Sequence, residues 1–326
     1  MESPGALRLL QEGRHAGRGH QTATDPAPLT VTRVSRKGLW WGLLGVLSFS
    51  FTVVFTRVAV EGLSPLFIGA ARAVVAAVLA GAALALTRQA RPTWGQCVRL
   101  MVIAAGIVLA FPVLTSYALT STSASHAAVV IALLPAATAV MAVLRGKESV
   151  RMLFWLVAAA GAVAAVVFAV LHGGGPGQIH WSDLLLFGAV LGAAIGYAEG
   201  GLLARELGAW QTISWALVVA APVMIVLTVV AVINQPPSAT AHQWAAFGYL
   251  AAVSMFLGFF AWYRGLAIGP IAQVSQVQLI QPVLSVLWAA VLLHERLTWQ
   301  TVLGAVAVIA CAGAAVRIRL DRQPAP

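Results

Sequence analysis

Ten apolar segments run along the chain, and each has the length of a membrane-crossing helix. A helix needs about 20 mostly apolar residues to cross roughly 30 Å of hydrocarbon. The breaks between the segments, such as "GLSP", "HGGGPGQIHW" and "NQPPSATAHQ", contain glycine, proline and polar residues, which is typical of loops. The sequence therefore predicts an all-α integral membrane protein with ten transmembrane helices. The segments are residues 39–60, 65–86, 98–119, 124–144, 152–171, 183–203, 211–233, 244–266, 272–293 and 299–316.

Composition and charge support a membrane protein over a soluble or nucleic-acid-binding one. Of 326 residues, 60% are hydrophobic and 9% are charged, whereas about a quarter are charged in a soluble domain. The net charge of +10 comes from basic residues in short segments between apolar runs, which fits membrane topology better than a nucleic-acid surface. Cys97 and Cys311 form no metal pattern. We therefore expect no metal, no cofactor and no nucleic acid partner.

The basic residues also predict an orientation. With the N-terminus in the cytoplasm, 17 of the 20 basic residues fall in cytoplasmic segments. Arg57 and Arg296 fall outside, and Arg72 lies within a span. This asymmetry follows the positive-inside rule. We expect a multi-pass protein of the plasma membrane with both termini in the cytoplasm.

The chain divides into two halves flanked by tails. Residues 1–37 are polar and basic and lack the apolar core of a signal peptide, so they are predicted to be a disordered cytoplasmic tail, with a cleaved targeting peptide as the alternative. Residues 38–172 and 180–318 are predicted to be two five-helix repeats. Residues 319–326 form a second cytoplasmic tail.

An internal repeat relates the two halves. Pro135 and Pro282 are 147 positions apart, and so are Glu148 and Glu295. A unit with an odd number of spans enters the membrane from opposite sides when it is repeated, so the two copies are predicted to be inverted. Prolines at matching depths are typical of secondary transporters and predict bends that act as hinges. The two glutamates are predicted to be structural charges that mark helix ends.

These features together resemble the drug/metabolite transporter superfamily, specifically its EamA type. The resemblance rests on the span count, the "P…E" segments, the arginine in "FIGAARAVVAAVLAG" and the segment "ERLTWQTVLGAVAVIACAG". It implies a permease that exports or imports amino acids, their derivatives or other small metabolites through a cavity between the halves. The first half departs from the pattern, because Val157 and Val166 occur where the second half has Gly304 and Gly313.

Three ionisable residues within spans are candidate site residues, because intramembrane charges usually face the bundle interior or a functional site. Arg72 could bind a substrate carboxylate, or it could form a structural ion pair or bind carbonyl groups. Glu199 could receive a cationic group or a coupling proton, or it could pair with Arg205 or another helix. His126 could respond to pH, or it could be a satisfied polar residue in the outer vestibule.

The ninth segment carries a polar stripe near its middle. Gln278, Gln281 and Ser285 fall on one helix face, whereas the equivalent positions in the fourth segment are Ile131, Leu134 and Thr138. A cavity between these segments would be polar on one side and apolar on the other, which suits an amphipathic solute such as an amino acid with an apolar side chain. The other cavity candidates are Ser48, Trp262 and Tyr263.

The sequence thus predicts a secondary transporter, most simply an exporter of amino acids or related amphipathic solutes by alternating access. The alternative is a membrane scaffold or lipid-interacting protein without solute turnover. The residues needed for an intramembrane enzyme, a phosphate-binding loop or a selectivity filter do not occur together in the sequence. The expected partners are a small-molecule substrate and membrane lipids, and both a monomer and a homodimer are compatible with the sequence.

Overall fold

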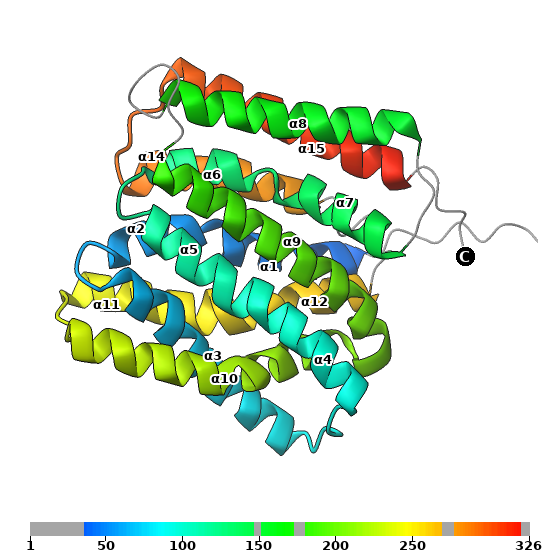
Figure 1. Cartoon of the computed structure of the whole chain (residues 1–326), viewed down its shortest axis with the longest axis vertical. Coiled ribbons are helices and arrows are strands. Elements are labelled where there is room, and N and C mark those ends of the chain that lie inside the picture. Colours follow the sequence, from blue (N-terminus) through cyan, green and yellow to red (C-terminus); the bar gives the residue numbers. More distant parts are fainter. Residues whose placement is uncertain (1–35, 147–150, 173–179, 269–276, 321–326) are drawn as a thin grey trace, which may run out of the picture. The chain divides into compact units, whose positions relative to one another are not determined.

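The computed structural model of the chain describes residues 36–146, 151–172, 180–268 and 277–320, and within these ranges it is helical without strands (Figure 1). The predicted tails therefore lie almost entirely outside the described residues, and Glu148 lies outside them as well. The first half contains α1 (Arg36–Ser50), α2 (Thr52–Ala59), α3 (Pro65–Leu86), α4 (Trp94–Ile103), the π-helix η1 (Ala104–Ala110), α5 (Phe111–Ala118), α6 (Ala124–Ile131), α7 (Leu134–Gly146) and α8 (Met152–His172). The second half contains α9 (Trp181–Leu207), α10 (Ala209–Asn234), α11 (Ala241–Gly248), the π-helix η2 (Tyr249–Leu257), α12 (Gly258–Ile268), the 3-10 helix η3 (Val277–Ile280), α14 (Gln281–Leu292) and α15 (Trp299–Leu320).

Eight of these helical segments are long and apolar enough to cross a membrane, and they coincide with the first eight predicted spans. The last two predicted spans correspond to shorter apolar helices, Val277–Leu292 and Trp299–Ala315. The protein is therefore a multi-pass membrane protein, and the count of ten spans remains a prediction.

α4 and α11 both begin earlier than the predicted spans, and each begins with a capping box. Thr93 caps α4 and exchanges hydrogen bonds with Gln96, and Thr240 and Gln243 do the same at α11. These residues satisfy backbone N–H groups that a helix start leaves free. The two boxes are 147 positions apart, the same offset that relates the two prolines. Hydropathy alone missed the polar first turns that they stabilise.

The third and eighth spans each contain a π-helix in the middle. The third span runs through α4, η1 and α5, and the eighth runs through α11, η2 and α12. Single π-turns inside α-helices are frequent at functional sites, because they change the direction of nearby side chains. Matching π-helices in the two halves were not predicted, since no residue pattern marks them.

Helices of the two halves pack against each other. α3 packs against α10, α1 against α12, and α8 against α15. α9 packs against α4, η1 and α5, so the first span of each half contacts the third span of the other. The core is consequently shared by both halves, and neither half encloses it alone.

Helix ends gather at two ends of the bundle (Figure 1), and the side chains at these ends differ in charge. The basic end carries the C-termini of α7, α9 and α12, where Arg99 and Arg145 pair with Glu199. At the same end the Arg264 guanidinium lies 5.0 Å from the centre of the Trp41 ring. The opposite end carries the N-termini of α6, α9 and α11. Arg72 lies in α3 between the two ends.

Glycines allow two of the contacts between halves to be very close. A Cβ added to Gly106 of η1 would overlap the backbone carbonyl oxygen of Gly192 in α9. A Cβ added to Gly265 of α12 would lie 2.6 Å from the backbone nitrogen of Gly42 in α1. Small residues at such positions let membrane helices pack backbone against backbone.

The substitution Gly106→Ala should therefore destabilise the protein. Because the overlapping atom belongs to the backbone, the helices have to separate, at a cost of about 1–3 kcal/mol and a fall in Tm of roughly 3–10 °C. Thermal unfolding in detergent measures this change. Gly201→Ala is the matched control, since a Cβ at Gly201 meets no atom within 4 Å. Equal melting temperatures for the two variants would contradict the close contact.

Candidate functional site

A central cavity lies between the two halves, and its empty space, open solvent included, is about 760 Å³. Its lining comes from seven of the spans and from the middle of each. The first half contributes Phe49, Thr52, Val53, Arg72, Ile107, Phe111, Ala128, Ile131, Leu134 and Pro135. The second half contributes Ala193, Tyr197, Ser254, Met255, Phe259, Gln278, Gln281, Pro282 and Ser285. A cavity at mid-depth between two repeats is where secondary transporters bind their solutes.

The fourth and ninth spans are interrupted where they meet the cavity. The fourth span breaks between α6 and α7, and Pro135 lies in the first turn of α7. In the ninth span, η3 gives way to α14, whose first turn contains Pro282. Both predicted hinge prolines thus begin a new helix, where the missing N–H is tolerated, and both line the cavity. Their role in movement remains a prediction.

The fourth and ninth spans contribute different side chains to the cavity lining. Gln278, Gln281 and Ser285 of the ninth span line it, and so do Ile131 and Leu134 of the fourth span. The structure therefore brings the predicted polar stripe and its apolar equivalents into one cavity. Their assignment to substrate binding is still a prediction.

The first span also breaks beside the cavity, between α1 and α2. The carbonyl oxygen of Ser48 accepts a hydrogen bond from Tyr249 Oη at 3.1 Å, and that of Ser50 accepts one from Ser285 Oγ at 2.8 Å. A broken membrane helix needs such partners, because lipid offers none. The Ser48 hydroxyl donates to the carbonyl of Leu44 at 2.9 Å, and Ser48 lies outside the cavity lining.

Arg72 is the charged residue of the cavity lining that the structure describes. Its side chain is buried, with 2% of the residue exposed. Its Nε and Nη1 atoms have no hydrogen-bond partner in the part of the chain that the structure describes. A buried guanidinium without such partners is energetically costly, so an arrangement of this kind favours a ligand that supplies them.

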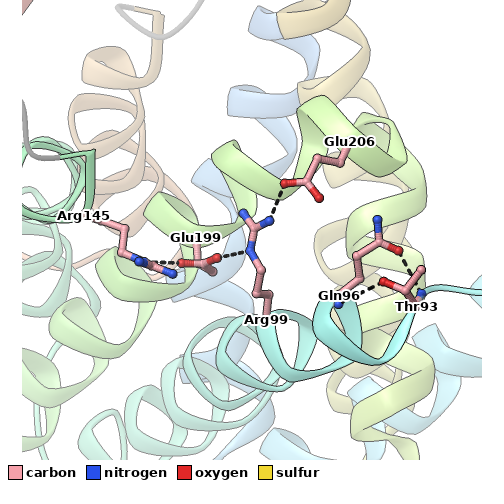
Figure 2. Close-up of polar contacts among 6 residues, drawn as sticks. All are labelled: Thr93, Gln96, Arg99, Arg145, Glu199 and Glu206. Atoms are coloured by element: carbon pink, nitrogen blue, oxygen red, sulfur yellow. Dashed lines mark hydrogen bonds and ion pairs between the residues drawn. The ribbon is translucent and has the colours of Figure 1, made fainter.

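Glu199 lies at the basic end, outside the cavity lining, and pairs with two arginines (Figure 2). Glu199 accepts a hydrogen bond from Arg145 Nε at 2.7 Å and another from Arg99 Nε. The Nη1 atom of Arg99 pairs with Glu206. This network joins α4, α7 and α9. Glu199 therefore pairs with residues of other helices, which was one of the two expected pairings. The other expected partner, Arg205, is six residues away and lies on a different face of α9.

His126 pairs with an aspartate that sequence reasoning missed. Its Nε2 lies 2.6 Å from Oδ1 of Asp183, which is 1% exposed. Asp183 also accepts a hydrogen bond from the backbone N–H of His180 at 3.1 Å, in the capping box that begins α9. An acid three residues after a helix start was the available signal. The pair joins α6 to α9 at the opposite end, away from the cavity lining.

Glu295 caps a helix of the other half. Its carboxylate accepts hydrogen bonds from the backbone N–H groups of Ala124 at 2.7 Å and Ser125 at 2.9 Å, and from the Ser125 hydroxyl. A carboxylate at a helix N-terminus satisfies free N–H groups and complements the helix dipole. The residue that ends the ninth span thus fixes the start of α6, a role that its position beside Arg296 did not reveal.

The substitution Glu295→Ala should destabilise the opposite end. Loss of a helix cap together with its dipole interaction costs about 1–2 kcal/mol. Hydrogen exchange of the α6 backbone amides should rise, which mass spectrometry can localise. Arg296→Ala, a change at an exposed neighbour, should leave that exchange unchanged. An unaltered α6 in Glu295→Ala would show that the cap contributes nothing.

Trp262 and Tyr263 are buried in α12 and lie outside the cavity lining. A Cβ added to Gly45 of α1 would lie 2.8 Å from the backbone of Trp262, so this residue forms part of the contact between α1 and α12. The Tyr263 hydroxyl has no hydrogen-bond partner among the residues that the structure describes. The structure gathers Arg72, Gln278, Gln281 and Ser285 at the cavity, together with the two prolines. The remaining cavity candidates lie outside its lining, namely Ser48, His126, Glu199, Trp262 and Tyr263.

The two halves, their interrupted spans and the shared cavity have the architecture of secondary transporters. The chain belongs to the EamA-like transporter family, whose model matches residues 36–171 and 180–316. It is 43% identical over 284 residues to the uncharacterized transporter YdeK of Bacillus subtilis (strain 168), a match that spans 85% of this chain and 96% of that protein. The predicted resemblance is thereby confirmed, and the protein is a membrane transporter.

The fold is also similar to that of a protein of known crystal structure. The TM-score is 0.60 at 18% sequence identity, and the match covers 88% of this chain and 99% of the other. At this identity the likeness concerns the fold alone.

Proposed function

We propose that the protein is a secondary transporter of the plasma membrane that moves small amphipathic solutes, amino acids or related compounds, by alternating access. Export is the direction that we propose. The observation that carries the proposal is the central cavity, where Arg72 and the polar groups of the ninth span meet apolar side chains of both halves. In such a lining, Arg72 and the polar side chains can bind a charged or polar group of the solute, and the apolar side chains can contact its apolar part.

We further propose ten spans in two inverted repeats, with the basic end and both termini in the cytoplasm. Three observations support this arrangement. The capping boxes at Thr93 and Thr240 share the 147-residue offset of the prolines. The first span of each half packs against the third span of the other. Most basic residues belong to segments that the proposed topology assigns to the cytoplasmic side, as the positive-inside rule requires.

Contacts at the two ends suggest how access could alternate. At the basic end the network around Glu199 joins α4, α7 and α9. At the opposite end His126 and Asp183 join α6 to α9, and Glu295 joins the ninth span to α6. If the contacts at one end separate while the contacts at the other end stay formed, the cavity would open to one side of the membrane at a time. The breaks at Pro135 and Pro282 would absorb the change of direction.

Counterflow in proteoliposomes tests this function. Vesicles that contain the purified protein are loaded in turn with amino acids, N-acyl amino acids and other small carboxylates, and entry of the labelled solute is then measured. We expect at least one solute to accumulate transiently, because exchange through a carrier is faster than net flux. Protein-free vesicles provide the control. If no solute in the panel exchanges at either membrane orientation, the protein does not act as this kind of transporter.

A further inference from the structure

We infer that the cavity selects solutes with a net charge of −1, in which one carboxylate binds Arg72 and the rest of the molecule is mainly apolar. The inference rests on the proposed transport function and narrows it. Among amino acid relatives it favours N-acyl amino acids and 2-oxo acids over the zwitterionic amino acids themselves.

The first step concerns the unsatisfied charge of Arg72. Its Nε and Nη1 atoms are buried beside the cavity and have no hydrogen-bond partner among the described residues. A guanidinium presents a planar fork of donors that matches the two oxygens of a carboxylate. The group best suited to accept hydrogen bonds from Arg72 is therefore an anion with two adjacent acceptor atoms.

The second step concerns the acids that could have neutralised Arg72 within the protein. Each of the five acidic residues that the structure describes has another partner. Glu61 pairs with Arg57, Asp183 with His126, Glu199 with Arg99 and Arg145, Glu206 with Arg99, and Glu295 with the start of α6. None of the described acidic residues therefore neutralises Arg72, and a solute carboxylate can fill this role.

The third step concerns what the same cavity offers to an ammonium group. The remaining polar side chains of its described lining are neutral amides and hydroxyls, which are Thr52, Tyr197, Ser254, Gln278, Gln281 and Ser285. Thr52 and Ser254 already hydrogen-bond to each other at 2.7 Å. An ammonium would lose its hydration here without meeting a carboxylate, and it would lie in the same low-dielectric space as Arg72. A zwitterion is therefore disfavoured relative to a monoanion.

The fourth step concerns the body of the solute. Phe49 and Phe259 form an edge-to-face pair with ring centres 4.8 Å apart, and both line the cavity with Phe111, Ile131 and Leu134. These side chains contact the apolar surface of a solute. They cannot replace the water that a small inorganic anion would lose on binding. The structure therefore points to an organic carboxylate and away from chloride.

Four leucine-like probes of different charge test the inference on the purified full-length protein. N-acetyl-L-leucine and 4-methyl-2-oxopentanoate carry a net charge of −1, L-leucine is a zwitterion, and N-acetyl-L-leucinamide is neutral. All share the same isobutyl group, and chloride is added as an inorganic anion. Thermal shift against probe concentration gives the apparent Kd, and counterflow gives transport. We expect at least one organic anion to bind about 10-fold or more tightly than leucine and the amide, with no stabilisation by chloride.

Arg72 variants link the selectivity to this residue. In Arg72→Gln the preference for the anion over the amide should disappear. Arg72→Lys retains the positive charge but loses the planar fork of donors, so it should still prefer the anion and bind it about 10-fold more weakly. If Arg72→Gln does not fold, this lysine variant tests the role of Arg72 in its place. An anion preference that survives in Arg72→Gln would overturn the role of Arg72.

The outcomes separate this inference from the proposed function. If leucine binds and exchanges as well as the anions, or if chloride competes equally with them, the inference is wrong and the transport function stands. If no probe of the set is bound, the inference is again wrong, and the broader panel of solutes decides on transport. If no solute of any charge exchanges, the transport function itself fails.

Discussion

Replacement of Arg72 by leucine should abolish transport and leave the protein at least as stable as before. The proposed carboxylate would lose its charged partner, and the removal of one member of a desolvated charged pair typically costs about 2–5 kcal/mol of binding, or roughly 30- to 5,000-fold in apparent affinity. The free protein would lose a buried guanidinium whose Nε and Nη1 have no described partner. An apolar side chain of similar volume is often neutral or stabilising at such a site.

Loss of transport without loss of stability in Arg72→Leu would distinguish a substrate-binding role of Arg72 from a structural one. A structural ion pair or carbonyl-binding role predicts that Arg72→Leu melts several degrees lower than the native protein, because its former partners would be left unsatisfied. Counterflow and thermal unfolding on one protein preparation measure both quantities. Arg57→Leu, which removes the arginine of the partly exposed pair with Glu61, controls for the change in total charge. Retained transport in Arg72→Leu would remove this residue from the site.

Replacement of Arg99 by methionine should destabilise the basic end more than any other change in its ion-pair network. Arg99 pairs with both Glu199 and Glu206 and is 24% exposed, whereas Arg145 pairs with Glu199 alone and is 58% exposed. Without Arg99, the buried Glu199 keeps only the more exposed partner. Since breaking a fully buried pair costs about 3–5 kcal/mol, we expect about 2–3 kcal/mol for Arg99→Met, or roughly 5–10 °C in Tm. Arg145→Met should cost less than about 1 kcal/mol.

A double-mutant cycle isolates this interaction. Glu199→Gln combined with Arg99→Met should cost less than the sum of the two single changes, with a coupling of about 1–3 kcal/mol. Arg57→Met is the control, because Arg57 and Glu61 are 3.7 Å apart and their side chains are 33% and 54% exposed, and such exposed pairs contribute about 0–1 kcal/mol. Additive effects of Arg99→Met and Glu199→Gln would mean that the Arg99–Glu199 pair seen in Figure 2 does not hold α4 to α9.

The span pattern and the repeat were predictable because they are written in local sequence. Hydropathy identified the apolar segments, and the 147-residue offset singled out Pro135 and Pro282, which lie at the breaks of the fourth and ninth spans. The polar stripe of Gln278, Gln281 and Ser285 was accessible from helical periodicity. These signals depend on one segment at a time or on a comparison of two.

Partners across helices were not predictable, because periodicity gives the face of a helix but not its neighbour. Glu199 was recognised as unusual, yet Arg99 and Arg145 lie 100 and 54 positions away in the sequence. Asp183 was overlooked because it lies in the first turn of α9, where an acid also serves as a cap. The π-helices of the third and eighth spans leave no residue signature, although they supply Ile107 and Ser254 to the cavity.

Thiol labelling at Gln281 tests most directly whether the cavity opens to both sides of the membrane. In a background in which Cys97 and Cys311 are replaced by serine and alanine, Gln281→Cys should react with a hydrophilic, membrane-impermeant reagent in right-side-out and in inside-out vesicles. A transported solute should slow both reactions. Val283→Cys is the matched control, since Val283 is exposed on the same helix and lies outside the cavity lining, and lipid should shield it from the reagent. Labelling of Gln281→Cys from one side only, with or without solute, would contradict alternating access.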